Sequence, residues 1–191
     1  MDHLDDGMRL EEEGDLEGAR RAFTSAAASD DPEVAVMGLF ALGQLSEAEG
    51  DAPAAEDAYR RAIAHAHPEH SPAAAFNLGL LLAEFDDPEG ARAAYQTAID
   101  AGHAEHSPRA AFNLGGLLRD QGDLDGARAA FQITIDSQDP VGAPVAAMEL
   151  AQVLQVQGDL EGARAAFQLA MSSDDEEFSR YARARMKALD R

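Results

Sequence analysis

Histidine side chains gather in two short segments and offer a set of metal-ligating nitrogens. The segments lie 36 residues apart, and neutral imidazole is a good ligand for zinc and nickel. If stacking brings the two segments together, their rings could meet at one ion. A duplicated loop without function gives the same pattern, so both interpretations stay open. The histidines concerned are His65, His67, His70, His103 and His106.

Catalytic chemistry has few candidates in this sequence. The chain contains no cysteine, which excludes disulfides, thiolate zinc sites and a cysteine nucleophile. The pair Gly115-Gly116 lacks the strand and the spacing of a phosphate-binding loop, and no serine lies in a nucleophile elbow. We therefore expect neither enzymatic activity nor a bound cofactor.

Negative charge dominates the composition. Asp and Glu number 36 against 15 Lys and Arg, a formal net charge of -21. A field of that sign repels nucleic acid and anionic lipid and favours a neutral or basic protein or peptide, although it could also serve solubility alone. The first 14 residues are acidic where a signal peptide is basic, and no apolar run approaches the ~20 residues of a membrane span. The expected location is the cytoplasm.

An internal repeat is the strongest pattern. The segment GDLEGARRAF returns as GDAPAAEDAY, DDPEGARAAY, GDLDGARAAF and GDLEGARAAF, each 36 residues after the last and without insertions. Such a period indicates an array of one small structural unit. The five copies begin at Gly14, Gly50, Asp86, Gly122 and Gly158.

Each copy has local reasons to form two helices. The aspartate of each Gly-Asp pair can cap a helix start, and the glycine can adopt a positive φ that ends the preceding helix. Ser71-Pro72 predicts the other helix start, with serine as the cap. Two such helices cannot bury both faces alone, so neighbouring pairs must stack. The expected pairs span 2–28, 32–66, 71–101, 107–137 and 142–172, in a single domain of residues 1–191.

Glycine recurs at two helical positions. One set lies in the first helices at Gly43, Gly79 and Gly115, where small residues let the facing helix and its aromatic rings approach closely. A second set lies in the first turn of the second helices, where glycine costs up to about 1 kcal/mol relative to alanine. That cost predicts a close backbone contact at Gly18, Gly90, Gly126 and Gly162.

Together these residues resemble the tetratricopeptide repeat. The match comprises Leu78, Gly79, Leu82, Ala91, Tyr95 and Ala98 in one unit, and Leu114, Gly115, Leu118, Ala127 and Phe131 in the next. Thr134 departs where the family has alanine. The segment AIDAGHAEHSPRAAFNLGGLL is also similar to the Sel1-like repeat, whose unit fits 36 residues better. The resemblance implies an all-α, right-handed superhelical solenoid of about five antiparallel helix-turn-helix repeats, used as a protein-interaction scaffold.

The C-terminal segment predicts a capping helix over about residues 175–190. Its acidic residues come first and its basic residues later, which suits the helix dipole. A polar cap of this kind protects the last unit of an array. An amphipathic helix offered to a partner is the alternative. The residues expected to hold the cap are Phe178, Tyr181, Ala182, Met186 and Leu189.

Large apolar residues occupy one register of the first helices, beginning with Leu4. The family resemblance implies that this register faces a concave groove, where such a row could bind an amphipathic helix or an extended peptide. Packing between neighbouring hairpins is the alternative. Asparagine follows in two copies, where some family members hold a peptide backbone, but the lysines of a carboxylate clamp are missing. The predicted groove residues are Phe40, Phe76, Asn77, Phe112, Asn113, Met148 and Glu149.

Three functions are therefore compatible with the sequence. The leading hypothesis is a scaffold that binds a peptide or protein segment in the groove. The second is a structural module that self-assembles into homo-oligomers, and the third is metal binding through the loop histidines.

Overall fold

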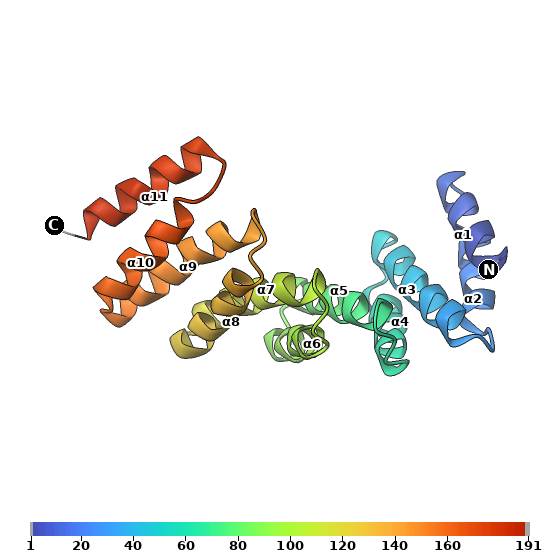
Figure 1. Ribbon diagram of the computed structural model, residues 1–191. Helices are drawn as coiled ribbons and strands as arrows, with labels where there is room; N and C mark the ends of the chain where they lie inside the picture. Colours follow the sequence, from blue (N-terminus) through green and yellow to red (C-terminus); the bar gives the residue numbers. More distant parts are fainter. Residues whose placement is uncertain (1, 190–191) are drawn as a thin grey trace. The chain divides into compact units, whose positions relative to one another are not determined.

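The computed structural model describes residues 2–189, and its regular elements in that range are all α-helices (Figure 1). The chain divides into an N-terminal unit that ends at His103 and a C-terminal unit that begins at Ala104. Across the described residues, no helix is long and apolar enough to span a membrane. The N-terminal unit contains α1 (Asp2–Glu12), α2 (Leu16–Ala27), α3 (Pro32–Ala48), α4 (Ala52–Ala64), α5 (His70–Glu84) and α6 (Pro88–Asp100). The C-terminal unit contains α7 (His106–Asp120), α8 (Leu124–Asp136), α9 (Gly142–Gln157), α10 (Leu160–Ala170) and α11 (Glu176–Ala188).

Successive helices pack in pairs, and the pairs stack on one another. In the N-terminal unit α1 packs on α2, α3 on α4 and α5 on α6, while α2 and α4 also contact the first helix of the following pair. The C-terminal unit repeats this arrangement with α7 on α8 and α9 on α10, and α11 follows against α10. The predicted all-α class, built from helix-turn-helix repeats and a terminal helix, is confirmed.

An aspartate caps the second helix of every pair, as predicted. Each carboxylate accepts a hydrogen bond from the backbone N–H three residues later, at 2.8 to 3.2 Å. The preceding glycine has φ between 77° and 82° in four copies, and Asp86 takes the same left-handed conformation at 59° in the remaining one. The five caps are Asp15, Asp51, Asp87, Asp123 and Asp159.

The same caps explain the repeated glycine in the first turn. A Cβ placed on Gly126 would lie 2.6 Å from a carboxylate oxygen of Asp123, closer than van der Waals contact allows. One copy has Ala54 at this position, and its hydrogen bond to Asp51 is the longest of the five, at 3.2 Å. Glycine therefore lets the carboxylate settle directly over the helix start, which is the close contact that the sequence predicted.

Removing one cap tests this account. We expect Asp123→Ala to lower the free energy of unfolding by about 1 kcal/mol, because the N–H of Gly126 loses its acceptor. The matched control is Asp123→Asn, whose side-chain oxygen still caps the helix and which should change stability by only a few tenths of a kcal/mol. Urea unfolding followed by circular dichroism measures both. An equal loss in the two variants would show that charge rather than capping matters here.

The serine predicted to cap the first helix of a pair does something else, so that prediction was wrong. Helix α5 already begins at His70, and Ser71 lies within its first turn. Its hydroxyl donates to the carbonyl of Ala62 at 2.9 Å and accepts from the N–H of His67 at 2.8 Å. Ser71 therefore adds a second hydrogen bond to a carbonyl near the end of α4, which also accepts from the N–H of His65, and ties two successive pairs together.

Within each pair a glycine of the first helix faces an aromatic ring of the second. A Cβ on Gly43 or Gly79 would lie 2.4 Å from the ring of Tyr59 or Tyr95, and both tyrosines are at most 2% exposed. The predicted close approach is confirmed, with the ring lying directly against the glycine. The departure at Thr134 also has a role, because its buried hydroxyl donates to the carbonyl of Pro108 at 2.9 Å.

Helix α11 forms as predicted but is held by fewer residues than expected. Asp175 caps it by accepting from two backbone N–H groups, and Ala182 is fully buried. Tyr181 is 54% exposed, so its predicted role in holding the helix was wrong. The predicted last residue of the cap, number 190, lies outside the described residues.

Candidate functional site

The predicted row of apolar residues divides into buried and half-buried members. Phe76 is 5% and Met148 4% exposed, whereas Phe40 and Phe112 are half-buried. Leu4 is also buried, at 3%. Each phenylalanine ring lies against the second-helix aromatic of its own pair, with ring centroids 5.8 to 6.4 Å apart. Packing thus accounts for most of this row, and Phe40 and Phe112 retain surface that another molecule could contact.

The C-terminal unit has a hollow where several predicted site residues meet. Its volume is about 230 Å³, and it opens between α7, α8 and α9. Gly116 leaves this space open, since a Cβ added there would meet no atom within 4 Å. The hollow brings together three of the seven predicted groove residues. Its lining consists of Phe112, Asn113, Gly116, Arg119, Phe131 and Glu149.

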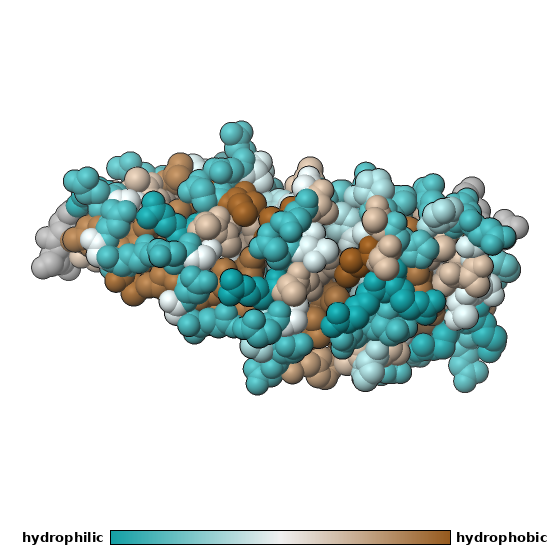
Figure 2. All heavy atoms as spheres, turned by 90° about the horizontal axis from the view of Figure 1, so that it is seen from below, coloured by the Kyte–Doolittle hydropathy of each residue, from teal (hydrophilic) through white to brown (hydrophobic). Residues whose placement is uncertain are grey.

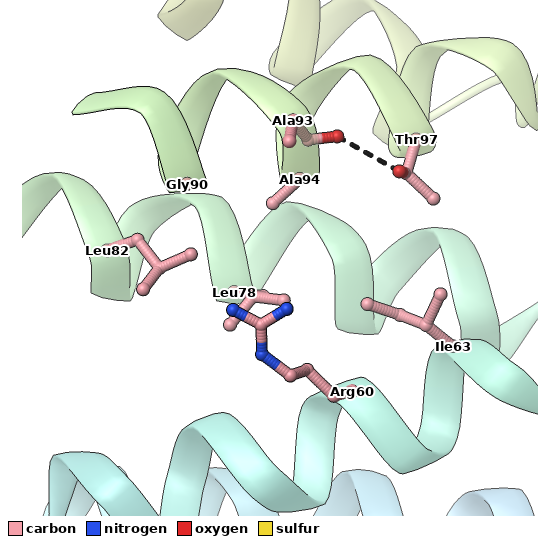
Figure 3. Close-up of a pocket in the computed structure, with 8 residues that line it drawn as sticks. All are labelled: Arg60, Ile63, Leu78, Leu82, Gly90, Ala93, Ala94 and Thr97. Atoms are coloured by element: carbon pink, nitrogen blue, oxygen red, sulfur yellow. Dashed lines mark hydrogen bonds between the residues drawn. The ribbon is translucent and has the colours of Figure 1, made fainter. Parts of the chain in front are cut away.

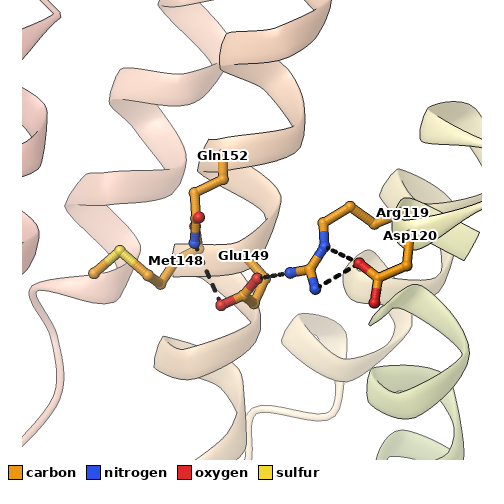
Figure 4. A network of polar contacts seen from close by, with 5 residues as sticks. All are labelled: Arg119, Asp120, Met148, Glu149 and Gln152. Carbon is orange, nitrogen blue, oxygen red and sulfur yellow. Dashed lines mark hydrogen bonds and ion pairs between the residues drawn. The ribbon is translucent and has the colours of Figure 1, made fainter. Parts of the chain in front are cut away.

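An ion-pair network forms one wall of this hollow (Figure 4). Arg119 of α7 reaches Glu149 of α9, and its Nε and Nη2 donate to Asp120 at 3.0 and 2.9 Å. Gln152 donates to the other oxygen of Glu149 at 3.3 Å. Two carboxylates thus share one guanidinium, so the wall carries no excess positive charge. This geometry disfavours an anionic group and suits a neutral or basic one.

In the N-terminal unit, a buried tyrosine of α4 makes a polar contact with α3, the first helix of its own pair. The hydroxyl of Tyr59 donates to Glu47 at 2.8 Å. Burial raises the pKa of Tyr59 well above its ordinary value of 10.0, the hydrogen bond to Glu47 raises it further, and a hydrogen bond with Asn77 opposes this. Asn77, one of the predicted groove residues, is thus close enough to affect the pKa of Tyr59 in the preceding pair.

Removing this hydroxyl should reveal its contribution. We expect Tyr59→Phe to lower the free energy of unfolding by about 1 kcal/mol at pH 7. The folded-state pKa is raised, so the contribution is complete below the unfolded value of 10.0 and is lost as the pH rises above it. The difference between wild type and variant should therefore shrink above pH 10. Urea titrations between pH 7 and pH 11 measure it, and a difference that stays constant would contradict the buried, protonated phenol.

A second hollow lies in the N-terminal unit (Figure 3). Its volume is about 280 Å³, and α4, α5 and α6 line it. Arg60 extends over Leu78, and its guanidinium is held by Glu56 at 2.8 and 2.9 Å. The hydroxyl of Thr97 donates a hydrogen bond to the carbonyl of Ala93 at 2.9 Å. No predicted site residue lines this hollow, and its polar groups already have partners within their own helices.

The loop histidines interact with one another and with acidic side chains. The rings of His67 and His70 stack with centroids 4.9 Å apart, and His103 Nε2 lies 3.2 Å from Glu69. Burial lowers the pKa of His70 and the neighbouring His67 lowers it further, while Glu33 and Glu69 oppose this. Within residues 2–189, no three His, Asp or Glu side chains are grouped as a metal ion would need.

Sequence reasoning did not include three of the six lining residues, Gly116, Arg119 and Phe131, among the predicted groove residues. Gly116 stands where the other pairs carry Met8, Gln44, Leu80 and Gln152, so its difference from the other copies was the available signal. Arg119 pairs with Glu149 and Asp120 in the structure, and neither its position in the repeat nor its neighbours in sequence indicated this.

Helix pairs that repeat every 36 residues and stack on one another define a helical-repeat protein. A family model described as "Tetratricopeptide repeat" matches four overlapping stretches, residues 4–71, 50–105, 76–143 and 112–178. The chain therefore belongs to the tetratricopeptide repeat family. A comparison with curated proteins gave no match. The likeness to Sel1-like repeats stays a prediction.

Several solved structures share the fold. The MamA protein has a TM-score of 0.69 and 22% identity, with 92% of this chain and 91% of that chain covered. YrrB, described as a tetratricopeptide repeat protein with an unusual peptide-binding site, has a TM-score of 0.67 and 18% identity, with 95% and 90% covered. BtubC from P. vanneervenii has a TM-score of 0.66 and 18% identity, with 95% and 78% covered. At these identities the likeness shows the fold alone.

Proposed function

We propose that this chain binds a peptide or protein segment on the face presented by its first helices. The hollow in the C-terminal unit carries the proposal, because it is open, partly apolar and provided with polar groups at its edge. Membership of the repeat family supports a binding role. Of the predicted groove residues, the half-buried ones are proposed to contact the partner, and the buried Phe76 and Met148 are proposed to support them from within. The half-buried residues are Phe40, Asn77, Phe112, Asn113 and Glu149.

The partner proposed is neutral or basic. The net charge of -21 attracts basic segments and repels nucleic acid and anionic membranes over a range set by ionic strength. Figure 2 shows hydrophobic residues exposed between hydrophilic ones on one face of the molecule, a mixture that suits a partner with both apolar and basic side chains. A chain without cysteine can work in a reducing compartment, and the cytoplasm is the location we propose.

Selection from a random peptide library displayed on phage tests the proposal. We expect peptides enriched on the wild-type chain to bind at least about tenfold more weakly, or 1.4 kcal/mol, to the double variant Asn113→Ala/Glu149→Gln. Fluorescence polarisation with the synthesised peptides gives the affinities. The control is Gln168→Ala, a change at an exposed residue of α10, a helix that does not line the hollow. No enrichment over empty support, or an equal effect of the control, would count against this face.

Self-association is a second candidate, and the charge of α11 favours it. This helix carries four basic and two acidic residues, in contrast to the acidic chain as a whole, and exposes Tyr181. Its basic side could attract the acidic surface of another copy. Light scattering over a range of concentration and salt distinguishes the two, because a chain that stays monomeric throughout excludes this candidate.

A further inference from the structure

One first-helix position distinguishes the C-terminal hollow from the same place in every other pair. The register of Gly116 is occupied elsewhere by Met8, Gln44, Leu80 and Gln152. Leu80 is 40% exposed, so side chains in this register reach the surface. Gly116 has none, and the atom that a side chain would first add meets nothing within 4 Å. No side chain of this residue occupies the open space beside α7.

The hollow has the size and lining for one large apolar side chain. Its volume of about 230 Å³ falls below the roughly 300–1,000 Å³ typical of small-molecule pockets. The half-buried ring of Phe112 supplies its apolar surface, and the fully buried ring of Phe131 packs behind it, with 5.8 Å between the ring centroids. Asn113 is half-buried at its edge and provides amide hydrogen-bonding groups. A leucine, methionine or phenylalanine from an extended segment would gain burial here without opening the core.

The charges beside the hollow define what should flank that apolar residue. Arg119 is bound by both Glu149 and Asp120, which leaves one negative charge in excess. The Asp120 side chain is 70% exposed, so its carboxylate also faces solvent. A lysine or arginine next to the inserted side chain would meet this carboxylate, whereas an aspartate or glutamate would be repelled.

We propose that Gly116 determines the specificity of this site, which accepts a large apolar side chain flanked by a basic residue of the bound segment. This inference rests on the proposed function and adds to it the chemical class of the partner. Glycine in a helix costs about 1 kcal/mol relative to alanine, so keeping this space open lowers the stability of α7.

Four pools of fluorescent nine-residue peptides, capped at both ends, test the inference. The central residue is Leu, Met or Phe in two pools and Ala, Ser or Gly in the other two. Within each of these two sets, one pool has Lys or Arg on both sides of the central residue and the other has Asp or Glu. The chain variants are Gly116→Leu, which fills the opening, Gly116→Gln, which copies Gln44 and Gln152, and Gly116→Ala, which leaves most of it free. Circular dichroism confirms that each variant is folded.

We expect the wild-type chain to prefer the apolar and basic pool about tenfold or more over each other pool. Gly116→Leu and Gly116→Gln should lose that preference, whereas Gly116→Ala should keep it. Equal binding of the preferred pool by wild type and Gly116→Leu, or a preference for acidic flanks, would overturn the inference while leaving peptide binding intact. Absence of binding by every pool to the wild-type chain would overturn both the inference and the proposed function.

Discussion

Replacing Gly115 by leucine is expected to lower the free energy of unfolding by about 3 kcal/mol, whereas the same change at the adjacent Gly116 should raise it by up to about 1 kcal/mol. A Cβ on Gly115 would lie 2.7 Å from two ring carbons of Phe131, which is fully buried. Overpacking of this kind costs more than the better helix propensity of leucine returns. At Gly116 only the propensity gain remains, because the added atoms enter open space.

The comparison is sharp because both glycines belong to α7 and share its backbone conformation. Urea unfolding followed by circular dichroism should place the midpoint of Gly115→Leu below and that of Gly116→Leu above the wild-type value. Repeat arrays can unfold in more than one step, so hydrogen exchange of the α7 and α8 amides provides a second readout. Equal destabilisation of both variants would mean that the surface at Gly116 is closed, and would also remove the basis of the specificity inference.

The helical pattern of this chain can be predicted from sequence because its determinants are local and repeated. An aspartate that caps a helix needs only the three residues that follow it, and a glycine with positive φ needs only its own backbone. Each occurs at a fixed interval of 36 residues, so every copy supports the interpretation of the others. The error at Ser71 arose where a local rule competed with a contact to the preceding helix, at Ala62.

The candidate site could be predicted only in part, because its geometry depends on contacts between pairs. Asn113 and Glu149 were selected from their register, and both line the hollow. The ion pair that joins Arg119 to Glu149 links positions 30 residues apart, and nothing in either local sequence specifies it. The burial of Phe76 likewise follows from packing on Tyr95, which is set by the whole pair rather than by one register.

Changes at Phe112 and Phe131, the two aromatic residues of the hollow, should affect stability and binding to different extents. We expect Phe131→Ala to lower the free energy of unfolding by about 3–5 kcal/mol, because the ring is fully buried and its loss leaves a cavity. Phe112→Ala should cost clearly less, since that ring is half-buried and the site can relax toward solvent. Thermal and urea unfolding measure both effects.

Phe112→Ala is therefore the variant whose binding can be interpreted. It should remain folded at 25 °C and bind the apolar and basic peptide pool more weakly than wild type, because the half-buried ring that lines the hollow is gone. Phe131→Leu serves as the control, since it keeps most of the buried volume and should retain more affinity than Phe112→Ala. Two results together would contradict this account of Phe112 and Phe131. The first is that Phe112→Ala binds the peptide pool as well as wild type, and the second is that Phe131→Ala is as stable as Phe112→Ala. The exposure of each ring would then predict neither its effect on binding nor its effect on stability.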